Sequence, residues 1–373
     1  MTGAHFDGDQ PVVSAHRPDH AQHASHLRLI SRDVDSTTTA NVDVIVVPTA
    51  REATILHDAF QLAQELACEL VVLCSRDAKA HEAESLAQQY DVKLTAVNVH
   101  PPSAPVTLTT RDYLAGLPFA RNSDTSLKRN LALALSRMVG WRHVLFQDDD
   151  VAITDAAQVR SAAALLDRYD AVGLNNVGFF DNSVVCHANR DTGGTQGYFV
   201  GAGGLLINAA RTDSFFPDVY NEDWFFLLED DGLIDVAMSG TCAQREFNPY
   251  LRTDRPRQEE FGDCLAEGLF SLLDDGLSIK GADHAFWRSF LDRRFELINT
   301  IQDRLAADPP ANAALMRTAL RTSQQTLRQI TPEHCVEFLT KWRQDRETWR
   351  RYLAGLPRGR RIEDALTHLG LQA

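Results

Sequence analysis

Short β-branched runs alternate with helical stretches over the first half of the chain. Val42–Val47 ends at a Pro-Thr pair, and residues with helical spacing follow from Ala53 to Ala67. The next strands and helices are expected, in alternation, at Leu70–Cys74, Lys79–Tyr90, Val92–Asn98, Asp124–Met138 and His143–Gln147. This alternation is typical of a parallel sheet that helices cover on both faces. We therefore expect an α/β fold.

Later segments follow other patterns. The Pro-rich stretch His100–Pro118 is expected to be a loose connection, and Asn182–Asn208 to mix β-like segments with Gly-rich turns. A helix is expected at Ala156–Tyr169, followed by a short strand at Ala171–Leu174. From Phe286 onward, apolar residues recur at helical spacing almost to the end of the chain.

These patterns divide the chain into three parts. Residues 1–40 carry scattered histidines with little apolar periodicity, and we expect a disordered leader there. Residues 41–285 are expected to form the α/β domain, and residues 286–373 a helical C-terminal extension. Within the extension, Thr331 is expected to be a helix N-cap with Pro332 in the first helical position.

Composition narrows the classes of function. The formal net charge of −14 argues against a nucleic-acid partner, because such partners need a basic surface. The six cysteines form no CxxC pair, which favours reduced thiols, and no segment has the apolar length to span a bilayer or to act as a signal core. These features favour a cytoplasmic protein. The Trp- and Arg-bearing helical stripe of the C-terminal extension could support a homodimer or contact an anionic surface.

Three consecutive aspartates, Asp148–Asp150, follow the strand expected at His143–Gln147. In an open α/β sheet, ligands bind beyond the carboxyl ends of the strands. Asp148 and Asp150 would project to the same side if the strand geometry persists. Two carboxylates about 5 Å apart repel by roughly 3 kcal/mol at an effective dielectric of about 20. A bound Mg²⁺ or Mn²⁺ would turn that penalty into attraction, whereas the alternative is a solvated acidic turn that caps the next helix.

Together with this run, several short motifs resemble those of the GT-A glycosyltransferases, especially the family-2-like group. The resemblance covers roughly residues 42 to 250 and implies a GT-A fold, with a Rossmann-like, mostly parallel sheet flanked by helices. Each motif is short, and the resemblance to this family rests on the order and spacing of the motifs together. The motifs, in chain order, are Pro48-Thr49-Ala50-Arg51-Glu52, Lys128-Arg129-Asn130, the DxD-like Asp148–Asp150, Gly201-Ala202-Gly203-Gly204, Phe216-Pro217-Asp218 and Asn221-Glu222-Asp223-Trp224.

The resemblance implies a glycosyltransferase that uses a UDP- or GDP-sugar donor together with Mn²⁺ or Mg²⁺. Asp150 would be the principal metal ligand, with Asp148 as a second ligand nearer the donor. His284 is a further metal candidate, although a lone histidine is more often structural. The residues expected on the donor side are Pro48, Thr49, Glu52, Asp77, Lys128, Arg129, Asp148 and Asp149. Lys128 or Arg129 could offset phosphate charge, with a solvated helix face as the alternative. Asp77 or Glu52 could hold the nucleobase or ribose, with an acid at a helix start as the alternative.

The pair Glu222-Asp223 is expected to supply the general base, and in the resembling inverting enzymes the second acid removes the acceptor proton. Asp223 is therefore favoured as the base of an inverting reaction, although the uncertain histidine leaves the anomeric outcome open. The alternative is that the pair only caps a helix. Gly203, Gly204 and Trp224 are expected on the side of an unknown hydroxyl acceptor, with a tight turn and a core helix as the alternatives.

The basic run Arg252–Arg257 could close over the pyrophosphate, select an anionic acceptor or form a solvated loop. Two other functions stay open. A sugar-phosphate nucleotidyltransferase usually has a Gly-rich, basic phosphate loop after the first strand, and Pro48–Glu52 contains no glycine. A non-catalytic nucleotide-sugar-binding protein would need no base, so the presence of Glu222-Asp223 argues against it.

Overall fold

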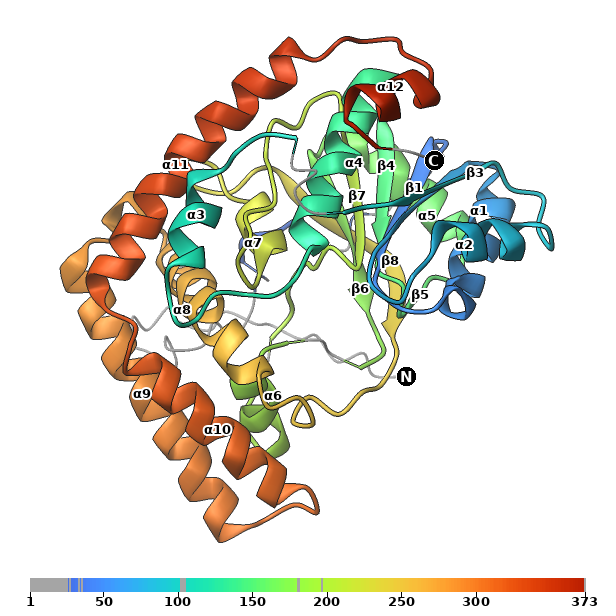
Figure 1. Cartoon of the computed structure of the whole chain (residues 1–373). Coiled ribbons are helices and arrows are strands. Elements are labelled where there is room, and N and C mark those ends of the chain that lie inside the picture. Colours follow the sequence, from blue (N-terminus) through green and yellow to red (C-terminus); the bar gives the residue numbers. More distant parts are fainter. Residues whose placement is uncertain are drawn as a thin grey trace, which may run out of the picture.

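The computed structural model describes residues 26, 28–32, 34, 36–100, 105–179, 182–195 and 197–371. An eight-stranded sheet forms the centre of the molecule, with the strand order β3-β2-β1-β4-β7-β6-β8-β5 (Figure 1). The strands are β1 (Val44–Thr49), β2 (Glu69–Cys74), β3 (Leu94–Asn98), β4 (His143–Gln147), β5 (Val151–Ala152), β6 (Ala171–Asn176), β7 (Gly204–Asn208) and β8 (Val236–Gln244). Four of the strand pairs are parallel and three antiparallel, so the expected mostly parallel α/β sheet is confirmed.

Helices cover both faces of the sheet, because alternate strand residues point to opposite sides. In β1, Ile45 and Val47 pack into one hydrophobic cluster, and Val44 and Val46 into the other. The first face carries α1 (His57–Leu66), α2 (Ala80–Ala87) and α5 (Ala156–Ala164), with the 3₁₀ turns η1 (Ala53–Leu56) and η2 (Leu165–Asp167). The second carries α3 (Thr109–Ala115), α4 (Thr125–Val139), α6 (Val184–Asp191), α7 (Glu222–Phe226), α8 (Arg255–Asp274) and η3 (Ile279–Gly281).

The expected helical C-terminal extension is also confirmed. It consists of α9 (His284–Ala307), α10 (Ala313–Leu327), α11 (Pro332–Gly355) and α12 (Ile362–His368). The three long helices run along one side of the molecule, and α12 lies beside α4 (Figure 1). Phe225 of α7 packs edge-on against Phe338 and Trp342 of α11, so the extension shares its core with the sheet. Thr331 caps α11 in a capping box, as its sequence predicts.

Two segments differ from the expectation. Asn182–Asn208 is mainly not β-structure, because Ser183 caps the helix α6 and only the last five residues form the strand β7. The connection His100–Pro118 contains the helix α3. The first turn of α3 is held by Asp345 of α11, whose carboxylate accepts hydrogen bonds from the backbone N–H and the hydroxyl of Thr110. Thr110 and Asp345 are 235 positions apart, so the local pattern of apolar residues could not predict this contact.

The expected disordered leader lies mostly outside the described residues, which begin at residue 26. Within residues 26–40, His26 and Ser31 are among the described residues, and both pack on the fold. Ser31 forms a parallel bridge with Ala237 of β8, and the buried ring of His26 stacks on Phe270 at 4.2 Å between ring centroids. Among the described helices, none is long and apolar enough to cross a membrane.

The topology brings several chain segments to one edge of the sheet. Strand β1 lies between β2 and β4 and is parallel to both, so the carboxyl ends of all three strands meet at the same edge. The chain proceeds from β1 outward to β2 and β3, and then returns to place β4 on the other side of β1. The change of direction between β1 and β4 is a topological switch point, where open α/β sheets bind ligands.

Candidate active site at the carboxyl edge of the sheet

The ends of β1 and β4 are joined by hydrogen bonds between Thr49, Arg51 and the aspartate run. The buried carboxylate of Asp149 accepts from the Thr49 hydroxyl at 2.6 Å and from Arg51 Nη2 at 2.5 Å. Asp150 also accepts from Arg51 Nη2, at 2.7 Å through its Oδ2. Asp149 therefore fastens the two strand ends together, while Asp150 remains at the surface with a second oxygen, Oδ1, that makes no hydrogen bond within the described chain.

Asp148 lies on the other side of this run, against the loop that precedes β7. Its Oδ1 accepts a 2.7 Å bond from Arg129, and its side chain is 32% exposed. A Cβ atom on Gly203 would lie 3.2 Å from Asp148 Oδ2, so the glycine lets the backbone approach the carboxylate. Burial, with a smaller contribution from the charge of Asp150, raises the pKa of Asp148 despite the opposing charge of Arg129.

Arg129 connects the aspartate run to the acidic pair at the start of α7. Its guanidinium is buried and donates to Asp148 and, at 2.8 Å, to Glu222 Oε1. Glu222 Oε2 accepts from Arg121 at 2.5 Å. Burial by itself would raise the pKa of Glu222, but the charges of Arg121 and Arg129 outweigh it and lower that pKa below its usual value. Glu222 is thus held as a carboxylate that organises two arginines.

Asp223 has a different environment from its neighbour. It makes no ion pair within the described chain, and its two oxygens accept from the backbone N–H groups of Ala202 at 3.0 Å and Trp224 at 2.9 Å. Burial, followed by the charge of Glu222, raises the pKa of Asp223 to about 6. Each carboxylate oxygen keeps a free lone pair. Asp223 is therefore the carboxylate of the pair that can take up a proton near neutral pH.

The expected phosphate contact of Lys128 does not fit this structure. The side chain is 1% exposed, and its ammonium donates to Thr49 O at 2.7 Å and to Ser75 Oγ at 2.6 Å. An ion pair with Asp124 at 3.1 Å uses the third donor of the ammonium group. Lys128 therefore ties the ends of β1 and β2 to α4, and Arg129 is committed in the same way to Asp148 and Glu222.

Other predicted residues divide between the site and the core. Glu52 and Asp77 are exposed and line a cleft of about 740 Å³ beyond the ends of β1 and β2. Pro48 is buried within β1. Trp224 is 3% exposed and packs on Phe270, which fits the core-helix alternative instead of an acceptor contact.

The remaining two predicted residues lie apart from the aspartate run. Gly204 opens β7, and a Cβ there would lie 3.1 Å from Cys242 Sγ, which makes it a packing glycine inside the fold. His284 is exposed at the first turn of α9. The structure thus brings Asp148 and Asp223 to Gly201–Gly203, with Asp150 two residues further along the aspartate run, and among the described contacts none brings His284 to them.

A buried network behind α7 fixes the position of the acidic pair. Asn221, the residue before Glu222, has a left-handed backbone with φ of 60°, and its side chain donates to Asp263 Oδ1 of α8 at 3.1 Å. Gly262 lets α8 approach the Tyr220 backbone, because a Cβ there would lie 2.3 Å from Tyr220 O. Asp263 is also ion-paired with the fully buried Arg294 of α9. The turn into Glu222-Asp223 is therefore fixed by two helices.

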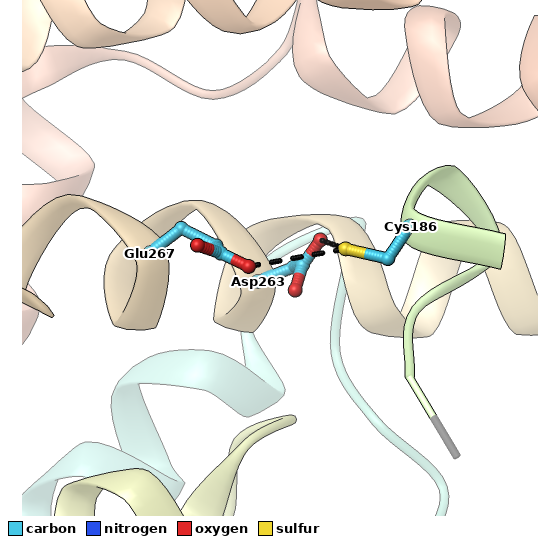
Figure 2. Close-up of side chains that lie close together, drawn as sticks. All are labelled: Cys186, Asp263 and Glu267. Carbon is cyan, nitrogen blue, oxygen red and sulfur yellow. Dashed lines mark hydrogen bonds between the residues drawn. The ribbon is translucent and has the colours of Figure 1, made fainter. Parts of the chain in front are cut away.

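The same network contains the one group of three metal-type ligands found among the described residues. Cys186, Asp263 and Glu267 each have a ligand atom within 4.8 Å of the others, and the Cys186 thiol donates to both carboxylates (Figure 2). Burial raises the pKa of the Cys186 thiol well above its usual value, whereas a metal ligand must be a thiolate. Because Asp263 already accepts from Arg294, Ser183 and Asn221, the group fits a structural network better than a metal centre.

Sequence reasoning did not connect several residues of this site to the aspartate run or to the acidic pair. Arg51 belongs to the motif Pro48–Glu52, but it contacts Asp149, 98 positions later in the sequence, only because β1 lies beside β4. Arg121 contacts Glu222 from a loop, and Asp263 of α8 contacts Asn221, the residue before the pair. The sequence contains one signal for Asp263, because the segment that forms α8 carries several acidic residues among apolar ones. The structure buries these acids, and buried acids need partners.

No protein-family profile matches the sequence, and no curated protein sequence matches it. Solved structures similar to the chain include the mannosyltransferase of Pyrobaculum calidifontis in complex with GDP-Man and Mn²⁺, at 14% identity and a TM-score of 0.42, covering 84% of this chain and 90% of that one. A nucleotide-diphospho-sugar transferase described as putative, from Desulfovibrio desulfuricans G20, matches at 11% identity and a TM-score of 0.30, covering 55% and 83%. The mannosyltransferase Ktr4p of S. cerevisiae matches at 8% identity and a TM-score of 0.27, covering 56% and 67%. At such identities and TM-scores, we draw no conclusion about this chain from these similarities.

Proposed function

We propose that the protein is a metal-dependent glycosyltransferase that moves a sugar from a UDP- or GDP-sugar to a hydroxyl acceptor, with inversion. One observation carries the proposal. Asp148 and Asp223 flank the same glycine segment, with Asp148 Oδ2 beside Gly203 and Asp223 Oδ2 beside Gly201, where added Cβ atoms would lie 3.2 and 3.4 Å from the two oxygens. Arg129 joins Asp148 to the acidic pair. Asp148, proposed to bind the cation, and Asp223, proposed to be the base, therefore both lie against the segment Gly201–Gly203.

The carboxylates of Asp148 and Asp150 fit a hard divalent cation. Each keeps one oxygen without a hydrogen bond in the described part of the chain, and their mutual repulsion contributes to the raised pKa of Asp148. Mg²⁺ and related ions take carboxylate oxygens from one or two residues and leave their other positions to water and phosphate. Bound Mn²⁺ or Mg²⁺ would neutralise the charge that develops on the leaving diphosphate.

Asp223 removes the acceptor proton in this proposal. The acceptor oxygen attacks the anomeric carbon while the bond from that carbon to the diphosphate oxygen breaks, so the electron pair leaves with the nucleoside diphosphate and the proton passes to Asp223. A single displacement of this kind inverts the anomeric centre. Glu222 stays ionised beside Arg121 and Arg129 and keeps the pair in position, because its lowered pKa makes it the weaker base.

The donor nucleoside is proposed to lie in the cleft lined by Glu52 and Asp77. Glu52, which lines this cleft, directly follows Arg51, and Arg51 is hydrogen-bonded to Asp149 and Asp150. The cleft therefore lies close to the aspartate run. Exposed carboxylates suit the hydroxyls of a ribose, and the Arg51 guanidinium, half-exposed above the aspartates, suits the diphosphate.

The proposal is tested by donor hydrolysis without an acceptor. UDP- and GDP-sugars, with and without Mn²⁺, are incubated with the protein, and the release of nucleoside diphosphate is measured. We expect release from at least one donor, and we expect chelation of the metal to abolish it. Pyrophosphate release from a nucleoside triphosphate and a sugar 1-phosphate, with no hydrolysis of any nucleotide sugar, would instead establish a nucleotidyltransferase and refute the proposal.

A further inference from the structure

A larger cavity, of about 1050 Å³, lies beside the proposed site between α3 and α4. Its lining includes Ser75 and Arg76 after β2, and Val99 and His100 after β3, so it opens at the same carboxyl edge of the sheet. Arg76 lines both this cavity and the smaller cleft that contains Glu52 and Asp77. The two hollows are therefore neighbours that share one side chain.

Four arginines line the cavity of an otherwise acidic protein. They are Arg76, Arg111, Arg121 and Arg257. Three aspartates line it as well, but two of them have cationic partners: Asp124 pairs with Lys128 at 3.1 Å, and Asp218 lies 3.8 Å from Arg111. The third aspartate is Asp112. The lining therefore carries one more positive than negative charge, although the chain as a whole has a net charge of −14.

Two of these arginines have only neutral hydrogen-bond partners. Arg76 donates through Nη2 to the backbone and side-chain oxygens of Asn122, at 2.9 and 3.2 Å. Arg257 donates through Nη1 to Pro118 O at 2.6 Å and to Ala120 O at 3.3 Å. Each guanidinium keeps further N–H donors, since arginine has five. Backbone and amide oxygens thus hold both groups in place, and neither forms an ion pair among the described residues, although Asp124 and Asp254 lie near enough to feel the charges of Arg76 and Arg257. The remaining N–H donors suit bidentate binding of a phosphate.

The cavity also reaches the catalytic side of the site. Arg121 lines the cavity and is bonded to Glu222, the residue next to the proposed base Asp223. The lining also contains apolar side chains, of which Val106, Leu108 and Leu127 are partly exposed. A ligand that fits both kinds of lining carries an anionic group and an apolar portion.

We propose that this cavity binds the acceptor, and that the acceptor is a phosphate-bearing molecule with an apolar part, held by Arg76 and Arg257. The inference rests on the proposed function, and it deepens that function by naming the acceptor class. Arg257 comes from the basic run Arg252–Arg257, whose anionic-acceptor alternative this placement favours. Arg255 and Arg257 stand in the first turn of α8, so this end of the run is helical and is not a solvated loop.

Calorimetry without donor or metal tests the inference separately from transfer. The probes are octyl phosphate, octanol and glucose 6-phosphate, which separate the contributions of the phosphate and the apolar part. We expect octyl phosphate to bind and octanol not to bind. Arg257→Met should weaken octyl phosphate binding at least about tenfold, because a bidentate charge-assisted contact is lost. Arg351→Met, which removes an exposed arginine of α11, should bind as the wild type does.

The remaining outcomes are equally informative. Binding of glucose 6-phosphate as tight as that of octyl phosphate would assign a soluble sugar-phosphate acceptor and overturn the apolar requirement. Octyl phosphate bound equally by the wild type and by a correctly folded Arg257→Met protein would overturn the assigned contact. Displacement of octyl phosphate by UDP or GDP would place the donor diphosphate in the cavity and overturn the acceptor assignment. Donor hydrolysis tests the proposed function independently of all three results.

Discussion

Replacing Asp223 with asparagine is expected to lower the rate of sugar transfer by about 10²–10⁴-fold, the usual contribution of a general base. Asparagine has nearly the same shape and keeps one oxygen that can accept from Ala202 or Trp224, so the turn into α7 should persist. Donor binding should change little, because Asp223 contacts neither Arg51 nor the aspartate run. The measurement is kcat for transfer alongside the affinity for nucleoside diphosphate.

The pH dependence of the wild type gives a second readout of the same role. A base must be deprotonated to act, and burial raises the pKa of Asp223 to about 6. The rate should therefore be constant above this pH and fall about tenfold for each pH unit below it, whereas Asp223→Asn should show no such limb. A variant that transfers sugar at a rate within threefold of the wild type, with the acid limb intact, would rule out Asp223 as the base.

Replacing Arg129 with methionine is expected to reduce the free energy of unfolding by about 3–5 kcal/mol, because it breaks the buried ion pair with Glu222 and leaves the partly exposed Asp148 without its cation. Arg129 is almost fully buried between Asp148 and Glu222, and its side chain also lies over the Phe216 ring. Chemical denaturation measures the loss. The effect should greatly exceed that of Arg351→Met, whose exposed ion pair with Glu347 contributes at most about 1 kcal/mol.

A double variant separates charge from packing. Adding Glu222→Gln to Arg129→Met removes the buried charge that has lost Arg129, but it also breaks the ion pair between Glu222 and Arg121. Because the two substitutions share one interaction, the double variant should lose less stability than the sum of the two single losses. If Arg129→Met alone costs less than about 1 kcal/mol, which is within the range of surface ion pairs, the buried bridge between the two acidic motifs would not be a stabilising feature.

The acidic edge could be predicted because its signal is local. A short apolar run followed at once by Asp148–Asp150 marks a strand end, and the order of the earlier elements places that end at the edge of a parallel sheet. Thr331 could likewise be assigned as an N-cap from its own neighbours. Both features depend on residues within a few positions of one another.

The roles of Lys128 and Arg129 could not be predicted, because they depend on which face of α4 meets the strand ends. Helical spacing showed an apolar stripe but not that the two cations beside it are buried and paired. The start of α3 depends on Asp345, more than 230 residues away. The left-handed turn at Asn221 depends on Asp263 of α8. Contacts at such separations are products of the completed fold.

Mn²⁺ binding in the presence of GDP or UDP tests the central claim most directly, with the free ion followed by electron paramagnetic resonance. The wild type should bind one tight Mn²⁺ per chain, and Asp148→Asn with Asp150→Asn should weaken this binding by far more than the about 10–100-fold lost when a partner of a metal ligand is removed. Asp254→Asn, which changes an exposed carboxylate at the start of α8, serves as the control and should bind as the wild type does. Equal Mn²⁺ affinity in the wild type and the double variant would show that these aspartates hold no cation, and the proposed glycosyl transfer would lose its basis.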